Sequence, residues 1–252
     1  LAGVAGWPAV LPAFAKTAWL SIVPEFNPFK YNSFPVNGGR QSFRLTQVLQ
    51  DQIGRMANTN QLNGLAPILT FQSVLDFTVS TRAIISALYA YLPANGSELV
   101  LFDVNRSVKF GPLLRRSSEA ALARTLPDLP QAYRITIVGN DAANPAATFA
   151  RTIGAGETTE RVKFLGVRYP PEIFSMSHVS IPFPLDDPLY GLYPDTTYED
   201  FGVQLGTLAP RGERGALVVN MDFLSRVASN PFFPFMLERI EYGIGDPQPR
   251  AM

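Results

Sequence analysis

The stretch from residue 66 to residue 104 limits the possible folds most strongly, because it reads as a strand, a helix and a second strand. Residues 66–73 (A-P-I-L-T-F-Q-S) form a continuous apolar run, as in strands buried within parallel sheets. Residues 80–92 have the spacing of an amphipathic helix, and a Pro-Ala-Asn-Gly turn precedes a strand at residues 98–104. A crossover of this length joins parallel strands. The sequence therefore predicts an α/β protein with a parallel sheet.

Further segments extend the α/β pattern. Residues 41–56 have helical apolar spacing with a polar opposite face. Helices are also predicted at residues 112–126, 223–228 and 235–242, and strands at residues 133–138 and 161–167. The chain contains no internal repeat and no low-complexity tract.

Composition excludes several classes of function. The 252 residues include 21 basic and 21 acidic side chains, so no net field attracts nucleic acid, and we expect no nucleic-acid partner. The chain has no cysteine, which excludes disulfides, thiolate metal sites and cysteine nucleophiles but leaves the compartment open. No apolar run approaches the roughly 18 residues of a membrane span, so no transmembrane segment is predicted.

Residues 1–45 are rich in aromatic side chains and proline and carry few charges. The prolines restrict this segment to short helices. One interpretation is an irregular segment that covers the core. The other is a hydrophobic cap over an apolar pocket, since aromatic loops are common binding surfaces. Its aromatic residues include Trp7, Phe14, Trp19, Phe26, Phe29, Tyr31 and Phe34.

One aspartate and the only histidine follow the order of a Ser–Asp–His hydrolase. Asp76 lies beyond the carboxyl end of the strand predicted at residues 66–73, where open α/β sheets place catalytic groups. His178 follows roughly a hundred residues later, after the strand predicted at residues 161–167. A triad aspartate accepts a hydrogen bond from the histidine ring, and the histidine shuttles protons near neutral pH. Asp76 and His178 are therefore the candidate catalytic residues.

Each candidate also has a structural interpretation. Taken alone, Asp76 fits a turn or helix-capping aspartate, and His178 fits a structural histidine. Asp103, at the end of the strand predicted at residues 98–104, competes for the role of the acid. It also fits a salt bridge to Arg106.

The nucleophile of such a triad is missing from the sequence. No serine has glycine both two residues before it and two residues after it, so the elbow G-x-S-x-G is absent from the 252 residues. Ser175, Ser177 and Ser180 flank His178, but residues adjacent in sequence point apart. None of the three is expected to be the nucleophile.

Metal and cofactor chemistry is not predicted. The pair Asp186-Asp187 precedes Pro188 and reads as a turn, and a metal enzyme needs more histidines or a denser carboxylate cluster. Gly154 and Gly156 lack the third glycine of a phosphate-binding loop and the strand before it. We therefore expect no metal and no cofactor.

The residues around Asp76 and His178 resemble the serine α/β-hydrolases of the lysophospholipase and monoacylglycerol-lipase kind. The resemblance rests on the run P-I-L-T-F-Q-S-V-L-D-F-T-V at residues 67–79, on the elements predicted up to residue 104, and on Ser177-His178. It implies the C-terminal half of an α/β-hydrolase parallel sheet with helices on both faces. Residues 1–60 would be a cap, and residues 61–252 the C-terminal part of the core.

The resemblance also implies an activity and its residues. Asp76 would be the triad acid and His178 the general base of an enzyme that cleaves acyl esters or lipid-like substrates. The chain departs from the family by an insertion at residues 105–165 and by the absent elbow. Alone, therefore, it is not expected to carry out acyl transfer.

A partner is expected for physical reasons as well. A fragment that contains only the last strands of a parallel sheet would expose an unpaired edge. We therefore predict association with a missing N-terminal segment, or self-association through the sheet edge. Two rival interpretations stay open: a non-catalytic binding module of the same fold that lacks a nucleophile, and a peptidase, because ester and amide cleavage use the same triad.

Overall fold

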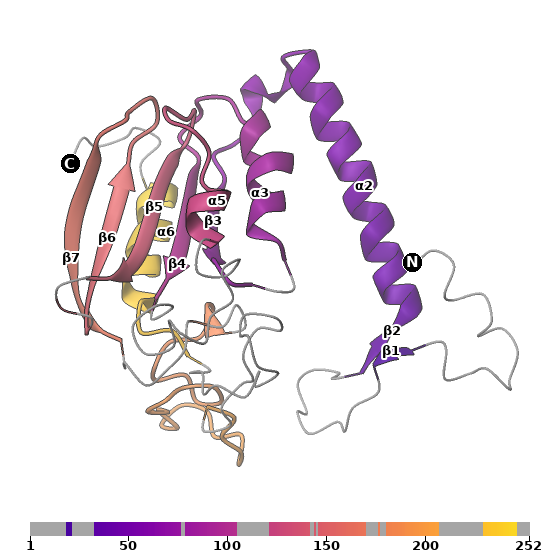
Figure 1. Ribbon diagram of the computed structural model, residues 1–252. Helices are drawn as coiled ribbons and strands as arrows, with labels where there is room; N and C mark the ends of the chain where they lie inside the picture. The colour runs from indigo at the N-terminus through magenta and orange to yellow at the C-terminus, as the bar shows by residue number, and fades with distance from the viewer. Residues whose placement is uncertain are drawn as a thin grey trace, which may run out of the picture. The chain divides into compact units, whose positions relative to one another are not determined.

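The computed structural model describes residues 19–21, 33–76, 79–104, 121–141, 144, 146–169, 176, 180–206 and 229–245 (Figure 1). The chain divides into two compact units, Leu1–Leu62 and Asn63–Met252.

The first unit contains a short antiparallel pair and one long helix. Strands β1 (Trp19–Ser21) and β2 (Phe34–Pro35) pair, and α2 (Val36–Asn58) follows directly. The helix predicted at residues 41–56 is thus confirmed and is longer at both ends. Trp19, Phe34 and Phe43 are exposed, whereas the remaining five aromatic residues named for the predicted cap lie outside the described residues. The cap stays a prediction.

The second unit is built on a five-stranded sheet in the order β3-β4-β5-β6-β7. Strands β3 (Leu69–Ser73), β4 (Glu98–Asp103) and β5 (Arg134–Asn140) are parallel. Strands β6 (Ala147–Ile153) and β7 (Glu160–Arg168) run antiparallel to their neighbours. The class α/β is confirmed, but the prediction of a parallel sheet is wrong for β6 and β7, because the short connections between β5, β6 and β7 permit only antiparallel pairing.

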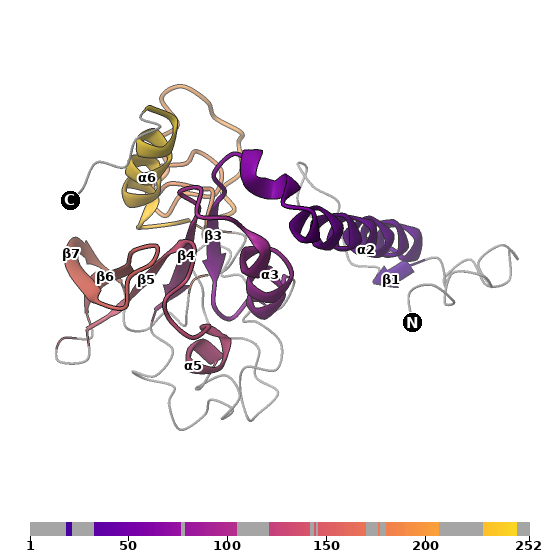
Figure 2. The same ribbon diagram turned by 90° about the horizontal axis from the view of Figure 1, so that it is seen from above.

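Helices lie on both faces of this sheet, as Figure 2 shows. One face carries α3 (Thr81–Ala87) and α5 (Ala121–Thr125), and the other carries α6 (Phe233–Gly245). Two short 3-10 turns, Gln61–Gly64 and Tyr89–Tyr91, complete the elements. Because strand side chains alternate between faces, β4 supplies both cores: Leu99 and Leu101 to the α3 side, and Val100 and Phe102 to the α6 side.

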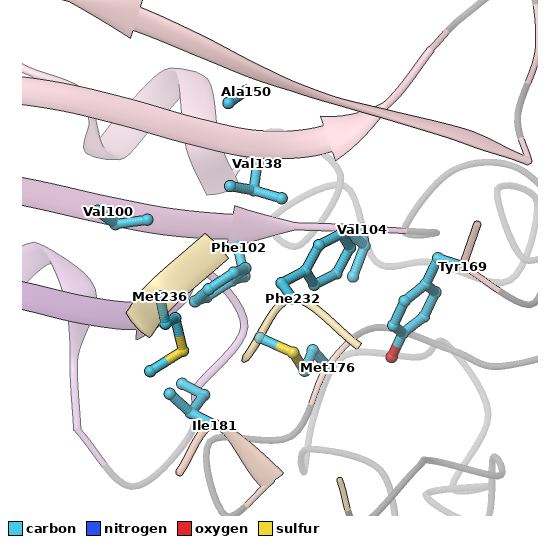
Figure 3. Close-up of a cluster of buried hydrophobic side chains, with 10 residues drawn as sticks. All are labelled: Val100, Phe102, Val104, Val138, Ala150, Tyr169, Met176, Ile181, Phe232 and Met236. Carbon is cyan, nitrogen blue, oxygen red and sulfur yellow. The ribbon is translucent and has the colours of Figure 1, made fainter. Parts of the chain in front are cut away.

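The α6-side core joins parts of the chain that are distant in sequence. Figure 3 shows strand residues packed with Met176, Ile181, Phe232 and Met236. Phe232 is fully buried, and its ring lies 5.8 Å from the ring of Tyr169 and nearly parallel to it. Met176, Ile181 and Phe232 thereby pack against the sheet.

A buried ion pair ties α6 to the start of β4. The Glu98 carboxylate pairs with Arg239 of α6, and both side chains are about nine-tenths buried. The Thr136 hydroxyl of β5 donates to Glu98 Oε1 at 2.6 Å, and Arg134 lies 3.7 Å from Oε2. A buried charge is tolerable only with such partners, so this cluster fixes α6 at the amino end of the sheet.

The two edges of the sheet differ in their protection. At β7, Gly166 has a φ of 70°, and the register with β6 shifts opposite this glycine, which is the signature of a β-bulge. Charged residues Glu160, Arg161 and Lys163 alternate with Val162 and Phe164 along the same strand. Bulges and edge lysines oppose further strand pairing. The sequence L-T-F-Q-S of β3 has neither device.

Candidate active site

The candidate acid lies at the carboxyl edge of the parallel strands. Strands β3 and β4 run side by side and end at Ser73 and Asp103. Asp76 lies three residues beyond Ser73, and its N–H donates to the Ser73 carbonyl at 3.1 Å. The prediction that Asp76 follows the carboxyl end of its strand is thus confirmed, and the turn places it at the edge where α/β sheets bind ligands.

Both oxygens of the Asp76 carboxylate accept hydrogen bonds, one from β3 and one from the loop between β3 and α3. The Val79 N–H donates to Oδ1 at 3.0 Å, which closes a turn, and the Gln72 amide donates to Oδ2 at 3.1 Å. The carboxylate is half-buried. A short aspartate held at both oxygens has little rotational freedom, which suits an acid that must orient another group.

The start of α3 fixes the other end of this loop. Ser80 caps the helix by accepting from the Ala83 N–H at 3.3 Å. The buried Thr81 hydroxyl donates to the Ser73 carbonyl at 3.3 Å. The loop that carries Asp76 is therefore tied back to β3 at both ends.

A hydrogen bond joins this strand end to the segment that leads to the only histidine. The Ser73 hydroxyl donates to the Met176 carbonyl at 2.7 Å, between residues 103 positions apart. Ser73 and Met176 are each about 1% exposed, so water does not compete for this bond. His178 lies outside the described residues, and the structure does not place it.

The remaining predicted positions fit structural roles where they are described. Asp187 Oδ1 accepts from the N–H groups of Leu189 and Tyr190 at 2.9 and 2.7 Å, which agrees with the predicted turn. Gly156, with a φ of 75°, lies in the connection between β6 and β7, so the prediction that no strand precedes Gly154 is wrong. Asp103 is half-buried at the end of β4, and Ser180 is buried. Ser175 and Ser177 lie outside the described residues.

Sequence reasoning missed two residues of this site, Gln72 and Ser73. Both are almost fully buried in β3. Their signal was available, because two polar side chains end an otherwise apolar strand directly before the candidate acid. Buried polar groups need partners, so such a pair indicates a local network.

Comparison with protein-family models, with curated proteins and with solved structures returned no match. The described part of the chain contains no group of three or more His, Cys, Asp or Glu residues arranged to hold a metal ion. Among the described helices, none is long and apolar enough to cross a membrane. Fold and site together define an α/β protein with a rigidly held aspartate at the carboxyl edge of its parallel strands.

Proposed function

We propose that this chain supplies the acid and the histidine of a serine hydrolase that cleaves carboxylic esters, of the lysophospholipase or monoacylglycerol-lipase kind. The observation that carries the proposal is the hydrogen bond from Ser73 to Met176. It joins the strand end before Asp76 to the segment before His178.

Chain geometry makes a contact between the two candidates feasible. Asp76 turns back onto Ser73 through its own N–H, and His178 is two residues from Met176. Two residues span at most about 7 Å, which keeps the His178 backbone within that distance of Met176. In the proposed mechanism Asp76 accepts the ring N–H of His178, and His178 takes the proton from the attacking serine.

The nucleophile of this mechanism comes from a polypeptide segment other than these 252 residues. Its proposed position is the open edge of β3, which pairs only with β4 among the described strands. Unlike β7, this edge has no charge, proline or bulge. A parallel strand added there would present its carboxyl end, and a serine following it, on the same side of the sheet as Asp76.

The proposed substrate is an acyl ester. The composition supports an apolar ligand, because residues 1–45 combine many aromatic side chains with few charges. A peptide substrate would use the same chemistry, so it is an outcome of the test below.

The test uses the complete product of the reading frame that encodes this chain. A fluorophosphonate probe labels activated serines, and the labelled peptide is mapped by mass spectrometry. We expect one labelled serine outside residues 1–252 and hydrolysis of p-nitrophenyl butyrate. Cleavage of peptide anilides but not esters would reassign the substrate. A product without labelling or hydrolysis would contradict the proposal and favour the non-catalytic binding module.

The substitution Ser73→Ala tests the hydrogen bond on which the proposal rests. Loss of a bond that fixes the segment before His178 is expected to lower kcat by about tenfold, since small misplacements of catalytic groups reduce rates strongly. KM should change less than kcat. The control is Thr148→Ala, which removes another buried hydroxyl, bonded to the Val167 carbonyl at 2.6 Å. Equal losses in the two variants would remove the special role of Ser73.

A further inference from the structure

Gln72 is a buried polar side chain of β3 at a position where packing of the sheet does not require a polar group. It is the fourth residue of β3, about 5% exposed, and lies on the α3 side of the sheet between apolar layers. Burying an amide costs free energy unless its hydrogen bonds are satisfied. Gln72 is therefore retained at a cost, and its partners indicate why.

The two donors of the Gln72 amide reach both ends of the loop that carries Asp76. Nε2 donates to Asp76 Oδ2 at 3.1 Å and to the Val79 carbonyl at 3.0 Å. It also lies 3.4 Å from the hydroxyl oxygen of Thr81. An amide NH₂ has two hydrogens, so the carboxylate and the Val79 carbonyl take both.

These hydrogen bonds fix the orientation of the Asp76 carboxylate. Val79 holds Oδ1 through its N–H, and Gln72 holds both Oδ2 and the carbonyl of the same Val79. The carboxylate plane is thus set by two donors, one on the strand and one on the loop. Each carboxylate oxygen accepts up to two hydrogen bonds, so neither of these contacts alone exhausts its oxygen.

We propose that Gln72 is a positioning residue that acts through Asp76, an inference that rests on the proposed function. It does not touch the substrate. It holds the Asp76 carboxylate in the direction from which the acid orients the histidine ring. Its contribution appears in kcat, because orientation of the base matters in the transition state rather than in substrate binding.

The experiment is a double-mutant cycle between Gln72→Met and Asp76→Asn in the complete gene product, assayed with p-nitrophenyl butyrate. Methionine has the length of glutamine and donates no hydrogen bond. We expect Gln72→Met to lower kcat by about 10- to 100-fold with KM nearly unchanged. In the Asp76→Asn background, Gln72→Met should not lower kcat further. The reason is that Gln72 acts on the histidine only through the Asp76 carboxylate, which this background lacks.

Two measurements separate positioning from loss of structure. Active-site titration with the fluorophosphonate counts competent molecules, so kcat is expressed per folded enzyme. Thr136→Val is the matched control, since it removes another buried side-chain hydrogen bond from the same sheet, at its amino end. The fold-loss in kcat caused by Thr136→Val should multiply with the fold-loss caused by Asp76→Asn. Gln72→Glu, which has the same length and no donor when ionised at pH 8, should lower kcat at least as much as Gln72→Met.

The possible results are distinct. If Asp76→Asn is strongly impaired and the Gln72→Met effect multiplies with it, Gln72 is only structural, and this inference falls while the proposed function stands. If Asp76→Asn stays within a few-fold of wild type, both fall. Loss of the Gln72→Met effect in the Asp76→Asn background supports both.

Discussion

Replacing His178 by alanine is expected to reduce kcat/KM for p-nitrophenyl butyrate by about 10⁴-fold or more, because the attacking serine loses its only general base. His178 is the one histidine in these 252 residues, so no other imidazole of this chain can substitute for it. The measurement is a steady-state assay of the complete gene product. Activity within a few-fold of wild type would refute the proposed mechanism.

The same assay distinguishes the two strand-end aspartates. Asp76→Asn should lower kcat by up to about 10⁴-fold, since an amide in place of the acid favours the wrong histidine tautomer. Asp103→Asn is the matched control, because Asp103 ends the adjacent parallel strand. A large loss with Asp103→Asn and none with Asp76→Asn would exchange their roles.

The largest effect on stability is expected at the buried pair between Glu98 and Arg239. Glu98→Gln leaves the Arg239 charge buried without its carboxylate, and breaking a buried pair from one side costs about 3–5 kcal/mol of unfolding free energy. For a chain of this size the melting temperature should fall by about 6 °C or more. Urea and thermal denaturation of the full chain measure the change.

An exposed ion pair between the same helix, α6, and strand β7 provides the control. Glu238 of α6 lies 3.6 Å from Lys163, with both side chains more than half exposed. Glu238→Gln should cost less than about 1 kcal/mol, because water screens the charges. The double variant Glu98→Gln/Arg239→Met should recover part of the loss, since no buried charge stays uncompensated. Equal effects at Glu98 and Glu238 would contradict this account.

The sequence predicted the elements whose pattern is local. The strands expected at residues 98–104, 133–138 and 161–167 correspond to β4, β5 and β7, and the helix expected at residues 235–242 lies within α6. Strand β6 was missed because its sequence A-T-F-A-R-T-I has small and polar residues on one face and no continuous apolar run. Without β6, the antiparallel direction of β7 was also hidden. The helix predicted at residues 223–228 lies outside the described residues.

The candidate site was predictable only in part. A strand end followed by an aspartate is visible in the sequence, and Asp76 lies where that pattern indicated. The partner of the Ser73 hydroxyl is a main-chain carbonyl 103 residues away, and carbonyls carry no sequence signal. The polar side chain of Gln72 is visible in the sequence, but its partners are not. Its hydrogen bonds depend on how the loop after β3 folds back.

In the proposed enzyme, the burial of Met176 links catalysis to the melting of the core. Its side chain packs with Phe232, Ile181 and Met236, and its carbonyl is bonded to Ser73 (Figure 3). Local opening at this position must break the packing of α6 against the sheet, so it requires a large share of the global unfolding free energy. Heat inactivation should therefore coincide with loss of near-ultraviolet circular dichroism instead of preceding it, and stabilising α6 should raise both temperatures together.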